Sequence, residues 1–291
     1  MILSSASSAL ADFVLGTPSV VAALAYICTA VMGESARPRL QILLLIGWAA
    51  HLLALVLDIA GFGQALPGAR FGFAPALSAT VWLVLAVYMI ESRFLPLPGV
   101  RRLLAGIALV AVVLAFLFPG ESRPHTASPW APLHWMLGLA SYGMFGVAVL
   151  HAVLLNRAER QLRHVGGGAG GAGSGSGSGS IGRQGECRAP VMPLLRLERL
   201  TFQFVAAGVA VLSLALLLGW WFTPYWRWDH KNLFAVLGWL VLSGLLAGRS
   251  VFGWRGRRAT RWLYFGALLL LLSYAGSRFV MEVVLQRQAG Y

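Results

Sequence analysis

The sequence has few charged residues and very few cysteines. Charged residues make up 11% of the 291 positions, whereas hydrophobic residues make up 58%. A globule of this length in water needs more polar surface than this composition supplies, which excludes a water-soluble fold. Cys28 and Cys187 lie far apart in the sequence, so one chain has no CxxC redox pair and no thiolate metal site.

The sequence also lacks the common catalytic motifs. It contains no P-loop, GxSxG, HExxH or dinucleotide-binding fingerprint, and its 10 acidic residues are scattered without a carboxylate pair. We therefore expect no independent catalysis. The net charge of +13 does not indicate a nucleic-acid partner, because the arginines form short clusters between apolar runs, as in the loops of membrane proteins.

Long apolar runs indicate a polytopic membrane protein in the lipid bilayer. Runs of about 20 residues favour transmembrane helices over a barrel, so we predict an all-α fold with about eight transmembrane helices. The expected spans are 13–33, 40–61, 76–95, 101–118, 133–156, 199–222, 232–249 and 260–282. Most arginines fall in the first, third, fifth and seventh loops, which places these loops in the cytoplasm and both termini on the outer, periplasmic side.

A Gly/Ser-rich tract at Gly166–Gly182 interrupts this pattern. Such a tract has no side chains to bury, so we predict a disordered cytoplasmic linker over 157–195. The linker separates a five-helix block, 1–156, from a three-helix block, 196–291. Membrane helices pack across such loops, so we treat 1–291 as a single membrane domain.

His51 and Asp58 are ionisable residues inside the second apolar run. They are seven residues apart and therefore share one helical face. Three interpretations remain open: a buried hydrogen bond for His51 with Asp58 at the interface, ligation of a metal or haem by His51, and a proton or cation path.

Two further histidines border the outer side in the expected orientation. His134 opens the fifth run, and His230 lies in a short loop after the sixth run. Around His230 stand residues that form an unusually dense aromatic segment: Trp220, Trp221, Tyr225, Trp226, Trp228 and Asp229. Aromatic rings beside imidazoles suit a haem, with His134 and His230 as iron ligands, although a plain interfacial anchor is the alternative. We assign His151, farther along the fifth run, no role.

Three segments resemble one known family. YWRWDHKNLFAVLGWLVL, GWRGRRATRWLYFGALLLLLSYAGSRF and PLHWMLGLASYGMFGVAVLHAVLL are similar to the CcsA-like cytochrome c assembly proteins. Within that family the chain resembles the YpjD or HemX-like branch of eight-helix inner-membrane proteins, in part through the histidine of AAHLLAL. The resemblance covers most of the chain outside the Gly/Ser tract.

The resemblance implies a bacterial inner-membrane protein that handles haem in cytochrome c assembly, together with other assembly proteins and apocytochrome c. It matches His134 to an outer haem-ligating histidine, and Trp226, Trp228 and Asp229 to a tryptophan-rich haem-presenting motif. His51 is a further candidate haem contact. The chain departs from the family pattern at Trp-Asp-His-Lys-Asn and lacks later histidines, so the alternative is a non-catalytic interaction or regulatory protein on the same scaffold.

Overall fold

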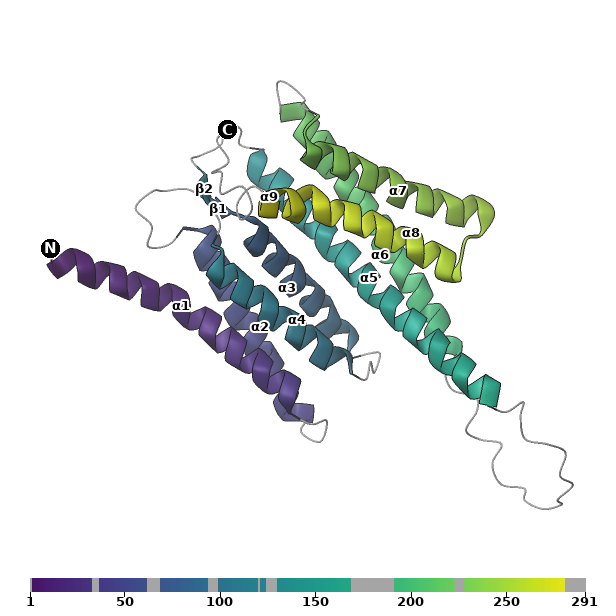
Figure 1. Cartoon of the computed structure of the whole chain (residues 1–291), viewed down its shortest axis with the longest axis horizontal. Coiled ribbons are helices and arrows are strands. Elements are labelled where there is room, and N and C mark those ends of the chain that lie inside the picture. Colours follow the sequence, from purple (N-terminus) through teal and green to yellow (C-terminus); the bar gives the residue numbers. More distant parts are fainter. Residues whose placement is uncertain are drawn as a thin grey trace, which may run out of the picture.

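The structure, a computed structural model, describes residues 2–32, 37–61, 69–93, 99–119, 121–123, 130–168, 191–222 and 228–280. Within these ranges the chain is a bundle of long helices, and the described part of every predicted apolar run is helical apart from one or two terminal residues (Figure 1). The predicted helical fold is therefore confirmed for this part of the chain.

The first four helices form one half of the bundle. They are α1 (Ile2–Val31), α2 (Arg37–Ile59), α3 (Phe73–Glu91) and α4 (Val100–Leu117). α1 packs on α2 and α4, while α3 packs on α2, α4 and α5. Three of the four helices begin and end close to the predicted positions, whereas α1 begins well before the predicted residue 13.

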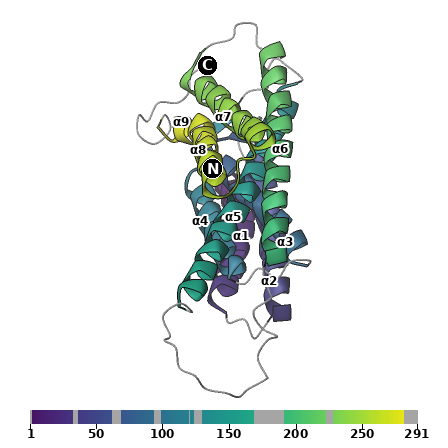
Figure 2. The same ribbon diagram turned by 90° about the vertical axis from the view of Figure 1, so that its right-hand side faces the viewer.

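The second half consists of the later helices. They are α5 (Ala131–Gly168), α6 (Val191–Phe222), α7 (His230–Phe252) and α8 (Gly256–Leu271), which continues through the π-helical turn η2 (Leu272–Gly276) into α9 (Ser277–Phe279). Figure 2 shows α6 along one side of the bundle, with α7 and α8 beside it. α5 and α6 occupy both ends of the segment 157–195 assigned to the linker, and residues 169–190 lie outside the described part.

A short pair of strands adds to the predicted all-α fold. β1 (Ala69–Phe71) and β2 (Glu121–Arg123) pair antiparallel, with Arg70 opposite Ser122. Strands of three residues are too short to show a hydrophobic period, so the sequence does not reveal them. They lie at the end of the bundle where α3 and α5 begin, which we call the β1–β2 end (Figure 1).

Two clusters of buried apolar side chains hold the bundle together. The first cluster contains side chains from all of the helices α1, α2, α3 and α4, among them Tyr26 and Leu85. The second contains side chains from α5, α6, α7 and α8, among them Val205 and Leu242. α5 contributes to both clusters, because Val147 belongs to the first and its neighbour Ala148 to the second. α5 is therefore the shared wall between the two halves.

Close helix packing in the second half depends on glycine. A Cβ atom on Gly238 of α7 would lie 2.8 Å from Leu270, and one on Gly266 of α8 would lie 2.6 Å from Leu242. Each glycine therefore receives a leucine from the opposite helix. Small residues at helix contacts are typical of membrane bundles, where van der Waals packing drives association.

The described helices agree with a membrane protein. In the part of the chain that the structure describes, 6 helices are long and apolar enough to cross a bilayer: α2 to α7. α1 has a shorter apolar segment, Gly16–Val31, and α8 spans 16 residues before it becomes π-helical. Length and composition thus identify six candidate crossings, and the total of about eight stays a prediction.

Candidate functional site

His134 lies in the first turn of α5, at the β1–β2 end of the bundle. Its Nδ1 atom is 2.8 Å from the backbone oxygen of Ala215 in α6. A carbonyl oxygen only accepts hydrogen bonds, so Nδ1 donates, and in the neutral imidazole Nε2 carries the lone pair. Histidines that ligate metals are commonly held in this way through their other nitrogen. The contact therefore fixes a ring orientation and a tautomer that suit ligation through Nε2.

The imidazole of His134 packs directly against the α6 backbone at Gly219. A Cβ atom at this position would lie 2.8 Å from Cε1 and 3.2 Å from Nδ1 of His134. The ring also lines a cavity of about 100 Å³ between α5, α6, α7 and η2. Lys231 and Tyr274 line the same cavity, and the Lys231 ammonium lies 5.9 Å from the centre of the Tyr274 ring.

An aromatic groove borders the His134 cavity. Trp220 at the end of α6 and Trp228 before α7 are 66% and 69% exposed, and both line an open groove of about 370 Å³. Leu216 lines both the groove and the cavity, so the two hollows share a wall. The exposed indole rings suit either the membrane interface or a flat apolar ligand.

The other predicted residues of this site lie around the start of α7. Asp229 is the N-cap residue of α7 and His230 is its first residue, and both are exposed. His230 does not line the His134 cavity, although the next residues, Lys231 and Asn232, do. Trp226 lies outside the described residues. The pairing of His134 and His230 on one iron therefore stays a prediction.

His51 occupies a different setting in the first half of the bundle. It is buried, with Nδ1 3.1 Å from the Tyr26 hydroxyl and Nε2 2.7 Å from the Ser78 hydroxyl. The imidazole therefore connects α1, α2 and α3. A metal would have to displace one of these hydroxyls before His51 could ligate it, so the predicted cofactor role of His51 stays untested.

His51 and Asp58 line one cavity of about 310 Å³, as their shared helical face predicts. Asp58 forms an ion pair with Arg70 of β1, with 3.3 Å between Oδ1 and the guanidinium nitrogen. The short strand thus places a basic residue beside Asp58, at the β1–β2 end of the helical face that His51 and Asp58 share. The proton or cation path remains a prediction.

The sequence matches a known family over most of its length. Residues 38–285 match the model of the family described as "Cytochrome C assembly protein". The chain belongs to the cytochrome c assembly protein family. The matched range contains His51, His134 and the tryptophan-rich segment, and it confirms the resemblance found in the sequence.

Individual relatives support the same assignment. The inner membrane protein YpjD of Escherichia coli (strain K12) is 29% identical over 181 residues, which are 61% of this chain and 62% of that protein. A cytochrome c biogenesis protein CcsA of Prochlorococcus marinus is 25% identical over 224 residues, or 70% of this chain and 71% of that protein. No solved structure matches the chain.

These comparisons also bear on location. The match to YpjD spans less than two thirds of that protein. The apolar helices, together with relatives named as an inner membrane protein and as CcsA, identify this family member as a multi-pass protein of the inner membrane.

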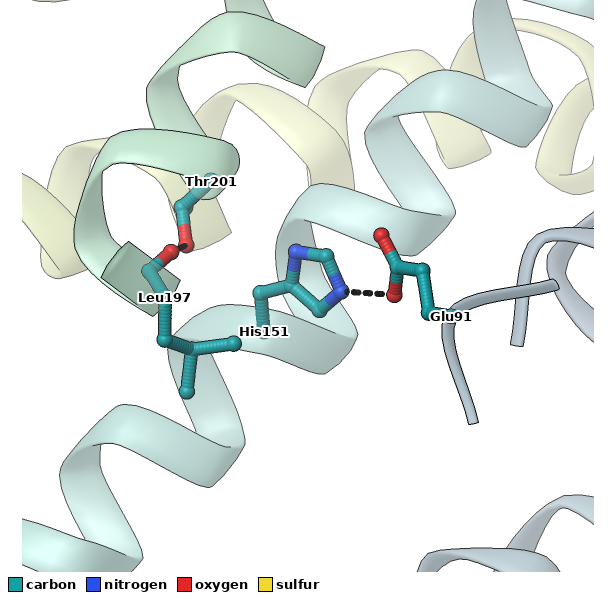
Figure 3. Close-up of polar contacts among 4 residues, drawn as sticks. All are labelled: Glu91, His151, Leu197 and Thr201. Carbon is teal, nitrogen blue, oxygen red and sulfur yellow. Dashed lines mark hydrogen bonds and ion pairs between the residues drawn. The ribbon is translucent and has the colours of Figure 1, made fainter. Parts of the chain in front are cut away.

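Sequence reasoning missed one buried polar pair in this family member. His151 of α5 is completely buried, and its Nε2 donates to Glu91 Oε2 at the end of α3, at a distance of 2.7 Å. Figure 3 shows the imidazole directed at Glu91, with Leu197 and Thr201 of α6 on its other side. A histidine inside an apolar run needs a polar partner. Because Glu91 ends a helix at the same side of the bundle, that requirement could have suggested the pair.

Proposed function

We propose that this protein binds haem at the β1–β2 end of the bundle and serves cytochrome c assembly there. The observation that carries the proposal is the hydrogen bond from His134 Nδ1 to Ala215, because it holds the imidazole in the form that ligates through Nε2. The relatives named as cytochrome c biogenesis proteins support the same process.

The residues around His134 suit a haem chemically. Haem combines an iron that imidazole ligates, a flat apolar ring and two carboxylates. His134 provides the imidazole, Trp220 and Trp228 provide flat apolar surfaces, and Lys231 provides a positive charge for a propionate. In the proposal His230, one residue from the cavity wall, is the second iron ligand.

The membrane orientation and the partners are part of this proposal. The basic residues gather in the loops opposite the β1–β2 end, so this end faces the outer compartment. Apocytochrome c would meet the haem there, with other assembly proteins. We assign the chain a role in haem delivery or attachment rather than an independent catalytic centre.

The proposal is tested by the haem content of purified protein. The protein is isolated in detergent from haem-replete cells, and its Soret absorbance is compared with that of His134→Ala, His230→Ala and the double variant. We expect His134→Ala to lose most of the haem and His230→Ala to lose part of it. Leu133→Ala, an exposed neighbour on α5, is the matched control and keeps the wild-type spectrum.

The alternative is an interaction or regulatory protein without haem chemistry. It predicts no Soret band in wild type, or a band that survives in the double histidine variant. A deletion strain separates the two further. Haem handling predicts that the deletion strain loses its c-type cytochromes, and that the wild-type protein restores them whereas His134→Ala does not. Normal cytochrome levels in the deletion strain support the alternative.

A further inference from the structure

A second cavity adjoins the His134 cavity. It has a volume of about 310 Å³ and lies between α3, α5 and α8. Almost all of its walls are apolar, and its aromatic walls come from Tyr142, Phe145, Tyr264 and Tyr274. The cavity lies where the first half of the bundle meets the second, so its shape depends on how the two halves pack.

The two cavities share the walls formed by Tyr142 and Tyr274. Ser273, which precedes Tyr274 in the chain, donates through Oγ to the backbone oxygen of Lys231 at 2.8 Å. This hydrogen bond ties the segment that carries Tyr274 to the start of α7, beside the boundary between the cavities.

The boundary lies on the π-helical turn η2, Leu272–Gly276. This turn carries both Ser273 and Tyr274. Single π-helical turns inside α-helices are uncommon, and they occur frequently at functional sites. Here the turn places a hydroxyl and an aromatic ring beside both the His134 cavity and the apolar cavity.

The size of the His134 cavity requires that a ligand extend beyond it. Pockets that hold small molecules have volumes of about 300–1,000 Å³, whereas the His134 cavity measures about 100 Å³. Two further hollows adjoin the His134 cavity through shared wall residues. One is the groove of Trp220 and Trp228 past Leu216, and the other is the apolar cavity past Tyr142 and Tyr274.

We infer that the apolar cavity receives one edge of the flat ring of the ligand that His134 holds. The inference rests on the proposed function, because it extends the same haem site inward from the outer face. The Tyr264 hydroxyl accepts from Asn156 at 2.9 Å. The rings of Tyr142, Phe145 and Tyr264 line the cavity and offer it apolar faces, which suit the edge of a macrocycle.

The experiment fills the apolar cavity without touching His134. Ala267→Phe adds a ring from α8, and Thr80→Leu adds volume from α3. Thr80 Oγ1 bonds only within its own helix, to Ala76, at 2.8 Å. The matched control is Ala207→Phe, which adds the same ring at an exposed position of α6 that lines none of these cavities. Each variant is first checked for wild-type thermal stability in detergent.

The probes are haemin, followed by its Soret band, and metal-free protoporphyrin, followed by its fluorescence. We expect Ala267→Phe and Thr80→Leu to weaken the binding of both porphyrins at least about tenfold, and Ala207→Phe to leave the binding of both unchanged. His134→Ala should weaken the binding of haemin much more than the binding of metal-free protoporphyrin, because only haemin has an iron to ligate.

The two proposals fail in different ways. Unchanged binding of both porphyrins by the stable cavity-filling variants overturns the inward extension, even if His134→Ala still loses haemin. Unchanged haemin binding by His134→Ala overturns the proposed ligand. Native mass spectrometry that shows a phospholipid lost from Ala267→Phe, with porphyrin binding intact, assigns the cavity to a lipid chain and also overturns the inference.

Discussion

The two halves of the bundle each contain a histidine that lines a cavity, yet the two imidazoles have different partners. In the first half, both nitrogens of His51 lie within hydrogen-bond distance of hydroxyl groups from other helices. In the second half, His134 donates through Nδ1 to a backbone carbonyl. A hydroxyl can donate or accept, whereas a carbonyl only accepts, so the second contact fixes the tautomer and the first does not.

For these two histidines, the hydrogen-bond partner of the imidazole indicates its role more clearly than burial alone does. His51 is the more deeply buried of the two, and its contacts join three helices of one half. This is the arrangement expected of an interhelical hydrogen-bond link. His134 is less buried and lines a cavity that shares Leu216 with the aromatic groove, which is the arrangement that the proposed haem site requires.

The largest expected effect concerns the pair that joins the halves. Glu91→Ala leaves the buried imidazole of His151 without its carboxylate partner, and we expect a loss of about 1.5–3 kcal/mol in the free energy of unfolding, as for hydrogen bonds to charged groups. The measurement is unfolding of the purified protein by titration with a denaturing detergent. Glu91→Gln keeps an acceptor oxygen and should lose less.

The double variant Glu91→Leu/His151→Leu provides the control for this pair. Removing both partners leaves no buried polar group unpaired, so the double variant should be more stable than Glu91→Ala. If Glu91→Ala were as stable as wild type, the contact would not join the halves energetically, and their association would depend on the apolar packing along α5.

The sequence predicts the helices well because each apolar run is long and bounded by polar residues. It also places His134 at a helix start and His51 and Asp58 on one face. It does not predict Ala215 as the partner of His134, because that contact depends on how α5 packs on α6. Glu91 and His151 are 60 residues apart, so local patterns alone do not identify the pair, although the need of a buried histidine for a polar partner points to helix ends on the same side of the bundle. The strands and η2 are too short for a periodic signal.

The next effect concerns the first half alone. His51→Leu removes both hydrogen bonds to Tyr26 and Ser78, and each such bond in a membrane protein contributes about 0.6 kcal/mol on average, with a maximum near 1.7. We expect a loss of about 1–2 kcal/mol in the free energy of unfolding, measured by the same titration, and an unchanged Soret band. Leu53→Ala, at a position 51% exposed, is the control on the same helix.

A loss of haem from His51→Leu at wild-type stability would contradict this division between the halves. It would show that His51 contacts the cofactor, which is the role that the sequence predicts for it. The comparison between the two imidazoles would then describe two parts of one haem site rather than a structural link and a ligand.

The smallest expected effect concerns the ion pair between Asp58 and Arg70, which lines the His51 cavity at the β1–β2 end. Asp58→Asn keeps the shape and an acceptor oxygen but removes the negative charge. The Asp58 and Arg70 side chains both retain some exposure, 19% and 13%, whereas the His151 side chain has none, and Asp58→Asn leaves Arg70 an acceptor oxygen. We therefore expect a loss of only about 0.2–1 kcal/mol. The difference from wild type should shrink in about 1 M salt, where the Debye length is near 3 Å. A loss of stability as large as that of Glu91→Ala, unaffected by salt, would mean that the Asp58–Arg70 pair is shielded from solvent. The contact of β1 with α2 would then stabilise the first half as much as the Glu91–His151 pair stabilises the association of the two halves.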